Sequence, residues 1–536
     1  MNRPIALSVG GAARPVRSLR ETLADALRAI PRPTPAQALA LLSFLGLVLV
    51  VLQYGTPTAL GAVALVAAVI PLLLWPEAAT LLMVFLLYAN IPAVASQHHG
   101  VPRFLAGAFV LLLIIPLGRI ALVRREALKA DRTFGGMLLF LGVLLIASLR
   151  ARGLGLAMDR ILTFAVEGLL LYWLVINVVR TLSTLRRVIW AILIAGAMLG
   201  GLTTYQEMTG SFDQQFGGLA QRNYEYLALK GGLLAEPDDP DVRAQVEEVL
   251  QRTGGERTQR AEGPVDEPNR FAQILLVLLP LAAFAYRTGR SRGSRIAAAT
   301  LGLLIASGIA FSDSRGALIA LVVVIAAAVK MRWVRPAHLL VGCILMIPIV
   351  PVVAPRLPER IVSIAAAASL VGADRPGAAD GAIRGRATEM LAAFQAFLDH
   401  PVIGVGPGQY RPFYSEEYHQ RNPRLAFRDI KGTRRAHTLY LELAAELGVV
   451  GLVAFLSIVL LLMRELGVMR RRWAGHPQLA DLAAALQLTL LAYLATGVFL
   501  HLAYERYYWF LLALAGAGVE IARRLEWSPA HGEGAP

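Results

Sequence analysis

The feature that most constrains this chain is a block of mostly apolar residues, roughly 17–22 long, that recurs along its 536 residues. A helix of about 20 apolar residues crosses the ~30 Å hydrocarbon core of a bilayer, and lipid offers no hydrogen-bond partner to an open backbone. Hydrophobic residues make up 56% of the sequence and charged residues only 17%. So little polar surface could not cover a soluble protein of this size. We therefore predict an all-α polytopic membrane protein.

Hydropathy predicts about 14 transmembrane helices in this chain. They are expected near residues 36–54, 58–75, 77–95, 104–123, 134–150, 160–179, 187–205, 269–286, 295–312, 316–330, 337–354, 437–463, 480–500 and 507–523. The chain then divides into seven parts: an N-terminal tail (1–35), helices 1 to 7 (36–205), an acidic loop (206–268), helices 8 to 11 (269–354), a lid-like loop (355–436), helices 12 to 14 (437–523) and a C-terminal tail (524–536).

The basic residues predict the orientation, because Lys and Arg collect in connections on the cytoplasmic side of a membrane. Both tails are then cytoplasmic, and both long loops lie on the outer face. This topology accounts for much of the net charge of +15, so nucleic-acid binding is a poor interpretation of that charge. The basic residues collect in the tails and in one set of connections: Arg14 to Arg32, Arg119 to Arg132, Arg180 to Arg187, Arg287 to Arg295, Lys330 to Arg335, Arg464 to Arg472, and Arg523 with Arg524.

Two further features narrow the class of protein. The first 35 residues are polar and basic and resemble a signal peptide poorly, so the first span is expected to remain as an anchor. The single cysteine, Cys343, lies inside an apolar span. A disulfide framework and a cysteine metal site are thereby excluded.

The second long loop, 355–436, has the more informative pattern. Residues 384–398 have helical spacing, with Met390, Phe394 and Leu398 on one stripe. The glycines and prolines of 399–408 then force a turn. A short amphipathic helix followed by a tight loop fits a lid over a cavity at the membrane surface. The alternative is a helix that rests on the lipid interface.

Arginines on the outer face run against the positive-inside bias and require an explanation. The sharpest case is AFSDSRGALIA, where Asp313 and Arg315 interrupt two apolar runs. A cation near lipid usually faces a polar cavity and a partner. Arg315 therefore either faces such a cavity, pairs with Asp313 or reaches the phosphates of lipid headgroups.

Other re-entry points bring more cations to the same face. Asn269 and Arg270 follow the acidic loop, and Arg434 and Arg435 precede the twelfth span. Arg386 from the lid-like helix adds another. Several converging arginines indicate an anion with more than one charge, and the planar guanidinium suits phosphate.

The twelfth span opens on a histidine and two acids. His437 stands where the chain re-enters the membrane, and Glu442 and Glu446 share one face of the helix. A histidine that is neutral near pH 7 can act as a general base, although a hydrogen-bonded structural role is the common alternative. Glu167, a single acid inside an earlier span, is either a proton relay or, preferably, the partner of an arginine.

Four motifs stand in one order on the expected outer face. They are PNRFA at 268–272, SDSRGA at 312–317, Arg386 followed by HPVIGVGPG at 400–408, and HxxYLExxxELGxxG at 437–451. Together they resemble the bacterial O-antigen ligase and O-antigen polymerase superfamily over roughly residues 265–455. The first seven spans contain no motif that matches.

The resemblance implies a membrane glycosyltransferase with a GT-C-like fold that works at the periplasmic face of the bacterial inner membrane. It implies transfer of a glycan from undecaprenyl diphosphate to an acceptor hydroxyl, with no cofactor and no metal ion. By position, Arg315, Arg386 and His437 correspond to the family's essential residues. Thr438 departs from the asparagine that often follows the histidine. The expected substrate-binding residues are Asn269, Arg270, Asp313, Arg434, Arg435, Glu442 and Glu446.

Three alternatives remain at this stage. A transporter of an anionic solute would suit many helices and outer arginines, but no internal repeat is visible. A scaffold for polysaccharide assembly would leave the arginines unexplained. The acidic run at 238–241 could hold a metal, although a solvated acidic segment is the preferred interpretation. The acceptor could be a lipid A–core sugar, a lipid-linked repeat unit or a protein.

Overall fold

The computed structural model of the chain describes residues 72, 74–102, 107–225, 258–337, 381–418, 421, 435–501 and 503–527. The expected span near 36–54 lies outside these residues, as do nearly all of those near 58–75 and 337–354. Cys343, the acidic run at 238–241 and Arg434 also lie outside them.

The first half of the described chain is helical throughout. It contains α4 (Pro76–Tyr88), α5 (Ile91–His98), the 3-10 helix η1 (Ala108–Leu113), α7 (Ile114–Gly118), the π-helix η2 (Arg119–Val123), α8 (Arg132–Ser148), α9 (Leu154–Thr163), the π-helix η3 (Phe164–Leu170), α10 (Leu171–Val178) and α11 (Leu182–Thr209).

The second half adds a small sheet to the helices. It contains the 3-10 turn η4 (Phe216–Gly218), β1 (Gln221–Glu225), β2 (Thr258–Gly263), α13 (Pro268–Leu276), α14 (Leu279–Arg287), α15 (Arg292–Phe311), α16 (Arg315–Lys330), α20 (Gly381–Asp399), α21 (Tyr410–Pro412), the π-helix η8 (Phe413–Tyr418), α23 (Leu439–Arg472), α24 (Pro477–Thr496) and α25 (Arg506–Trp527).

Six helical segments of the described chain are long and apolar enough to cross a membrane, or seven if the α4–α5 pair, bent by 57°, forms one span. One of the six runs continuously through α9, η3 and α10, and another combines α13 with α14. The class of integral membrane protein is thereby confirmed. The count of about 14 spans and the layout of the two loops remain predictions.

Helix boundaries follow local capping chemistry. The Asp131 side chain accepts a hydrogen bond from Phe134 N at 2.8 Å and begins α8, and Thr181 caps α11 in the same way. Ser291 and Ser294 cap α15 reciprocally. Such side chains satisfy amide groups that have no partner within the helix. Two of these caps, Thr181 and Ser291, lie in basic connections, and Asp131 lies beside Arg132.

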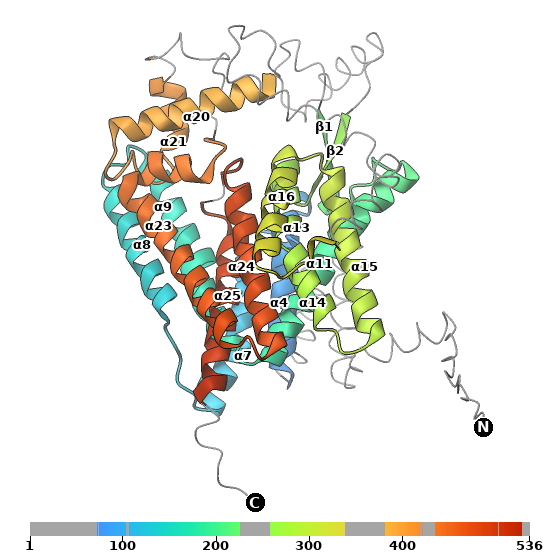
Figure 1. Cartoon of the computed structure of the whole chain (residues 1–536). Coiled ribbons are helices and arrows are strands. Elements are labelled where there is room, and N and C mark those ends of the chain that lie inside the picture. Colours follow the sequence, from blue (N-terminus) through green and yellow to red (C-terminus); the bar gives the residue numbers. More distant parts are fainter. Residues whose placement is uncertain are drawn as a thin grey trace, which may run out of the picture.

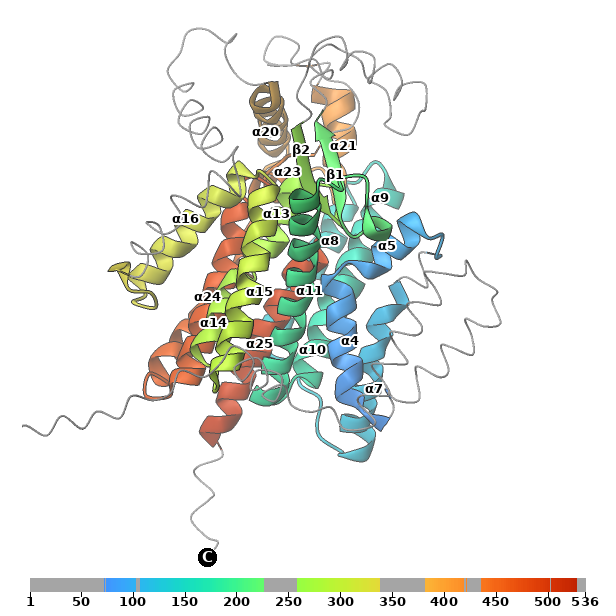
Figure 2. The same cartoon turned by 90° about the vertical axis from the view of Figure 1, so that its right-hand side faces the viewer.

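A two-stranded antiparallel sheet closes the acidic loop at its base, and the sequence analysis did not predict it. Gln221 pairs with Gly263, and Glu225 with Thr258. The sheet sits at the same end of the bundle as α20 (Figures 1 and 2). Arg222 fixes it to α11 through an ion pair with Glu207 at 2.5 Å and a hydrogen bond to Gln206 at 2.9 Å. The strands were missed because QRNYE and TQRAEG have no alternation of apolar and polar residues.

Helix α20 lies across the end of the bundle, over the beginning of α23 (Figure 1). Its small residues Ala392, Ala393 and Ala396 are buried and allow close packing on Tyr410 and its neighbours. The stripe of Met390, Phe394 and Leu398 is exposed instead, at 37%, 46% and 53%. The stripe therefore faces away from the bundle, which is compatible with contact to lipid.

Helices α11 and α15 pack closely because glycines line their contact. A Cβ added at Gly200 would lie 2.0 Å from the carbonyl oxygen of Leu304. Gly308 on α15 meets Gly200 directly, since its Cβ would lie 2.9 Å from the Gly200 Cα. Small residues that bring backbones together are a main source of helix association in membranes.

Replacing Gly200 with Ala should therefore destabilise the protein, because the backbone of α15 cannot move aside cheaply. We expect a loss of about 1–3 kcal/mol in the free energy of unfolding, seen as a lower thermal midpoint in detergent. Gly201→Ala is the matched control, because its Cβ would lie 3.9 Å from Leu304. Equal midpoints for the two variants would contradict the packing argument.

Candidate functional site

The end of the bundle that carries α20 (Figure 1) contains polar residues from six separate elements. They come from the beginnings of α13, α16 and α23, from α20 with α21, and from the connection between α24 and α25. Among the expected site residues, Arg434 lies outside the described chain. The others are placed there by local features of the sequence, which differ from element to element.

The beginning of α13 is fixed by Glu267. Its carboxylate accepts hydrogen bonds from the backbone nitrogens of Asn269 at 3.2 Å and Arg270 at 2.6 Å, and Pro268 occupies the first turn. The Asn269 side chain also donates to Glu267 at 2.6 Å and accepts from the Ser314 hydroxyl at 2.9 Å. Asn269 thus connects α13 to α16, so its observed contacts are internal to the protein.

The SDSRGA turn is held by a residue of β2. The Arg260 guanidinium donates to the carbonyl oxygen of Ser312 at 2.9 Å and to that of Asp313 at 3.4 Å. Asp313 adopts φ +51°, and the Ser314 hydroxyl caps α16 through Ala317 N at 3.3 Å. This fixed geometry makes Arg315 the first residue of α16, where it is half-buried.

The same turn packs on the connection between α24 and α25. A Cβ added at Gly316 would lie 3.1 Å from the ring of Phe499. The Leu439 backbone nitrogen, at the beginning of α23, donates to Gly497 O at 2.7 Å. The beginnings of α16 and α23 therefore both adjoin residues 497–499, which brings Arg315 and His437 to one region.

Helix α23 is broken at Gly448, where φ is +65° and ψ is −167°. The glycine-rich loop after α20 completes the interrupted hydrogen bonding. Val405 N donates to Ala445 O and Gly406 N to Glu446 O, both at 2.9 Å. In the opposite direction, Val449 N donates to Pro401 O at 2.8 Å. The HPVIGVGPG and ELGVVG motifs thus form one structural unit.

His437 adopts φ +51° just before α23, and an acid orients its ring. Its Nε2 lies 3.2 Å from Oε2 of Glu389, whose side chain is 5% exposed. Glu389 belongs to α20, and Arg386 lies one turn before it on the same face. The structure therefore brings Arg386 to the side of α20 that faces His437.

A second histidine, His501, stands beside the first. The centroids of the two rings are 5.6 Å apart, and the planes are nearly perpendicular. Burial lowers the pKa of His501 well below its usual value, and the nearby cations Arg435 and Arg270 add to this effect. His501 is therefore neutral at pH 7.

The two acids of α23 are both buried, at 7% exposure for Glu442 and 3% for Glu446. The Glu446 carboxylate accepts hydrogen bonds from Tyr410 N at 3.4 Å and from the Tyr504 hydroxyl at 3.2 Å. The Arg160 guanidinium lies 5.3 Å from the centroid of the Tyr504 ring. Glu446 thus connects α21 to the α24–α25 connection.

Arg435 lies close enough to the buried Glu442 for the two charges to interact. Burial lowers the pKa of Arg435, and Glu442 partly opposes this effect. Arg411 and Arg160 lie close enough to interact with Arg435 as well. The structure thus places Arg435, Arg411 and Arg160 near one another, and the anion site itself stays a prediction.

Arg270 has a different environment from the one expected. It forms an ion pair with Glu505, at the beginning of α25. Arg506, the next residue, has its Nη1 3.8 Å from Oε1 of Glu167 and also donates to Asn90 Oδ1. Glu167 is therefore the partner of an arginine, as preferred from the sequence.

Four residues near the site were not predicted from the sequence: Glu389, His501, Glu505 and Arg506. The last three lie in the short connection 497–505 or directly after it, between two apolar spans on the expected outer face. They share with Arg315 the position of a polar residue in a short outer connection, which is the signal in the sequence that could have found them. Glu389 gave no comparable signal, since an acid on an amphipathic helix is ordinary.

The side chains of the site decide whether it could bind a metal ion. Within the described ranges, no group of three or more His, Cys, Asp or Glu side chains is arranged to bind an ion. The carboxylate beside His437 is that of Glu389, and the charged groups near His501 include Arg435, Arg270 and Arg411. Their chemistry suits an anionic ligand rather than a cation.

Comparison with known families decides the assignment. Residues 300–456 match the family described as O-antigen ligase. The second half of the chain is therefore similar to the O-antigen ligase family over this range. The resemblance to the O-antigen ligase and polymerase superfamily is thus confirmed, and the matched range includes Arg315, Arg386 and His437. The chain matches no curated protein.

The match to the O-antigen ligase family supports glycan transfer in general, and the apolar helices indicate an integral membrane protein. The matched range contains α16, α20, α21 and the part of α23 that holds the break at Gly448. It does not contain α13 or the α24–α25 connection. Asn269, Arg270 and His501 are therefore added to the site by the fold of the whole chain.

The break in α23 predicts a strong effect of Gly448→Ala. A Cβ there would lie 2.3 Å from the carbonyl carbon of Val402, at a backbone conformation that L residues avoid. We expect loss of the monodisperse peak in size-exclusion chromatography or a clearly lower thermal midpoint.

Gly210→Ala is the control for positive φ without the contact. Gly210 has nearly the same φ, +67°, with ψ of 13° where Gly448 has −167°, and a Cβ there would meet nothing within 4 Å. We expect only the conformational cost of about 1 kcal/mol. If Gly210→Ala is as damaging as Gly448→Ala, the contact between loop and broken helix is not what stabilises α23.

Proposed function

We propose that this protein is an inverting, metal-independent glycosyltransferase of the O-antigen ligase type. It transfers a glycan from undecaprenyl diphosphate to an acceptor hydroxyl. The observation that supports this most directly is the pairing of His437 with Glu389, at 3.2 Å, among arginines from several elements. The family match to residues 300–456 supports the same class of reaction.

His437 is the proposed general base. A carboxylate near Nε2 favours the tautomer with a proton on that nitrogen, which makes Nδ1 the atom that accepts a proton. In the transfer, the acceptor oxygen forms a bond to the anomeric carbon while the bond from that carbon to the diphosphate oxygen breaks. The hydroxyl proton moves to His437, and Glu389 stabilises the imidazolium. A single displacement of this kind inverts the anomeric configuration.

The arginines are proposed to stabilise the leaving diphosphate. Its negative charge grows as the glycosidic bond breaks, so fixed cations stabilise the transition state more than the ground state. Arg315, Arg386 and Arg435 are the main candidates. Arg270 already has Glu505 as its partner, which makes it a positioning residue in this proposal.

The distribution of basic residues supports placing this site at the periplasmic face of a bacterial inner membrane. The groups 464–472 and 523–524 lie at the end of the bundle opposite α20, where the described chain ends (Figure 1). The positive-inside bias would make that end cytoplasmic. The end with α20, α21 and His437 is then the outer one.

The acceptor is proposed to be a glycan. A sugar of lipid A–core would make the protein a ligase, whereas another lipid-linked repeat unit would make it a polymerase. A protein acceptor fits the same chemistry. The anion-transporter alternative is not favoured, because the arginine and histidine cluster lies at one end of the bundle rather than at its centre.

Replacing His437 with Ala should reduce glycan transfer by about 100-fold or more, since a general base contributes at least that much. The measurement is transfer by the purified protein in proteoliposomes, with an undecaprenyl-diphosphate-linked glycan as donor. His476→Ala is the control, because His476 is exposed in the connection between α23 and α24. Glu389→Gln should give a smaller loss. Transfer that continues at the normal rate in His437→Ala would overturn the proposed role.

Removal of divalent ions separates this mechanism from a metal-dependent one. We expect membranes washed with a strong chelator to keep their transfer activity, because arginines replace the metal as the counter-charge of the diphosphate. A bond with retained anomeric configuration, or activity restored only by an added metal ion, would contradict the mechanism. Uptake of an anionic solute into the same proteoliposomes would instead support a transporter.

A further inference from the structure

A second charged site lies at the other end of the bundle, away from His437. It is an open cavity of about 290 Å³ between the ends of α23 and α25 and the beginning of α8. Four arginines and two glutamates line it: Arg132, Arg464, Arg472, Arg523, Glu465 and Glu526. None of these residues belongs to the proposed transfer site.

The two acids of this cavity are already paired with arginines. Glu465 forms an ion pair with Arg523 at 2.7 Å, and Glu526 forms one with Arg472 at 3.1 Å. Within the part of the chain that the structure describes, Arg132 and Arg464 form neither an ion pair nor a hydrogen bond. With four arginines and two glutamates, the cavity has a net charge of +2, which a bound anion would neutralise.

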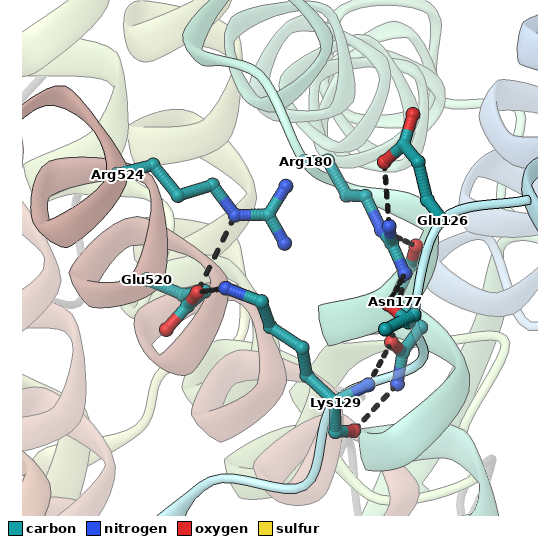
Figure 3. A network of polar contacts seen from close by, with 7 residues as sticks. Glu126, Lys129, Asn177, Arg180, Glu520 and Arg524 are labelled. Carbon is teal, nitrogen blue, oxygen red and sulfur yellow. Dashed lines mark hydrogen bonds and ion pairs between the residues drawn. The ribbon is translucent and has the colours of Figure 1, made fainter. Parts of the chain in front are cut away.

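A separate network of polar contacts fixes the connection that precedes Arg132 (Figure 3). Lys129, three residues earlier, exchanges hydrogen bonds with the Asn177 side chain at 2.8 and 2.9 Å, and its ammonium group pairs with Glu520 of α25. Arg180 pairs with Glu126 at 2.7 Å in the same connection. The beginning of α8 is thus fixed against α10 and α25, so the cavity is a preformed feature.

The inner wall of the cavity is apolar. Leu461, Val468 and Val519 line it together with the buried Met469 and Ala522. Leu461 lies three residues before Arg464, so it is about 4.5 Å further from the end of α23. Further exposed leucines lie on the same helices, also away from the charged end of the bundle: Leu138 and Leu139 on α8 and Leu460 on α23. A charged rim therefore leads into an apolar surface.

We propose that this cavity binds an anionic phospholipid. The phosphate of the headgroup interacts with Arg132 and Arg464, and an acyl chain lies along the apolar wall. Arginine gives paired hydrogen bonds to phosphate, and basic pockets between membrane helices suit anionic headgroups. A free phosphate ion would use the two arginines but leave the apolar wall uncovered, so the geometry favours the lipid.

The test compares lipid binding to the whole purified protein and to Arg132→Gln/Arg464→Gln. Native mass spectrometry counts bound phosphatidylglycerol during titration in detergent. We expect about 30-fold weaker binding by the double variant, which is about fivefold for each arginine. Arg119→Gln/Arg471→Gln is the matched control, because it removes the same charge from exposed arginines outside the cavity. It should bind as the unaltered protein does.

Two further binding experiments use the unaltered protein, so the proposal can be tested even if the double variant does not fold. Phosphatidylcholine, with matched acyl chains and no net charge, should bind much more weakly than phosphatidylglycerol. Inorganic phosphate should not displace the bound lipid at millimolar concentration. Equal binding of the two lipids, displacement by phosphate, or the same loss in both double variants would overturn the proposal.

Discussion

The arrangement of the site depends on one constraint, which is that a helix broken in an apolar environment must find partners for its backbone groups. Helix α23 is broken at Gly448, and the loop after α20 supplies the missing hydrogen bonds through Val405, Gly406 and Pro401. Two glycines allow the approach, because a Cβ at Gly404 or at Gly448 would lie 2.3 Å from the opposing backbone. The break therefore fixes α20 above the beginning of α23.

This contact explains why His437 meets an acid from a different part of the chain. Glu389 lies on α20, and its position relative to His437 follows from how the loop at 400–408 joins α23. The α24–α25 connection completes the site from the other side with His501 and Glu505. A carboxylate beside a histidine and several arginines on separate elements form an arrangement suited to proton acceptance next to an anion.

The charged side chains at the two ends of the bundle lie in different environments. At the α20 end, arginines are enclosed among acids and aromatic rings, as with Arg160 above Tyr504. At the other end, several arginines pair with acids near the surface, as Arg523 does with Glu465, and Lys129 and Arg180 fix a connection to α10 and α25. Enclosed charges interact strongly because water is excluded, whereas exposed charges are screened. The first arrangement suits chemistry, and the second suits anchoring and contact with headgroups.

The sequence alone determined the class of membrane protein, the family and the candidates Arg315, Arg386 and His437. It could do so because apolar length and local motifs are properties of neighbouring residues. Only the tertiary structure decided that Glu389 orients His437, that Arg270 pairs with Glu505 and that His501 joins the site. It also revealed β1 and β2, which show no alternating pattern. Such pairings join residues far apart in the chain, and no local spacing encodes which carboxylate will face which cation.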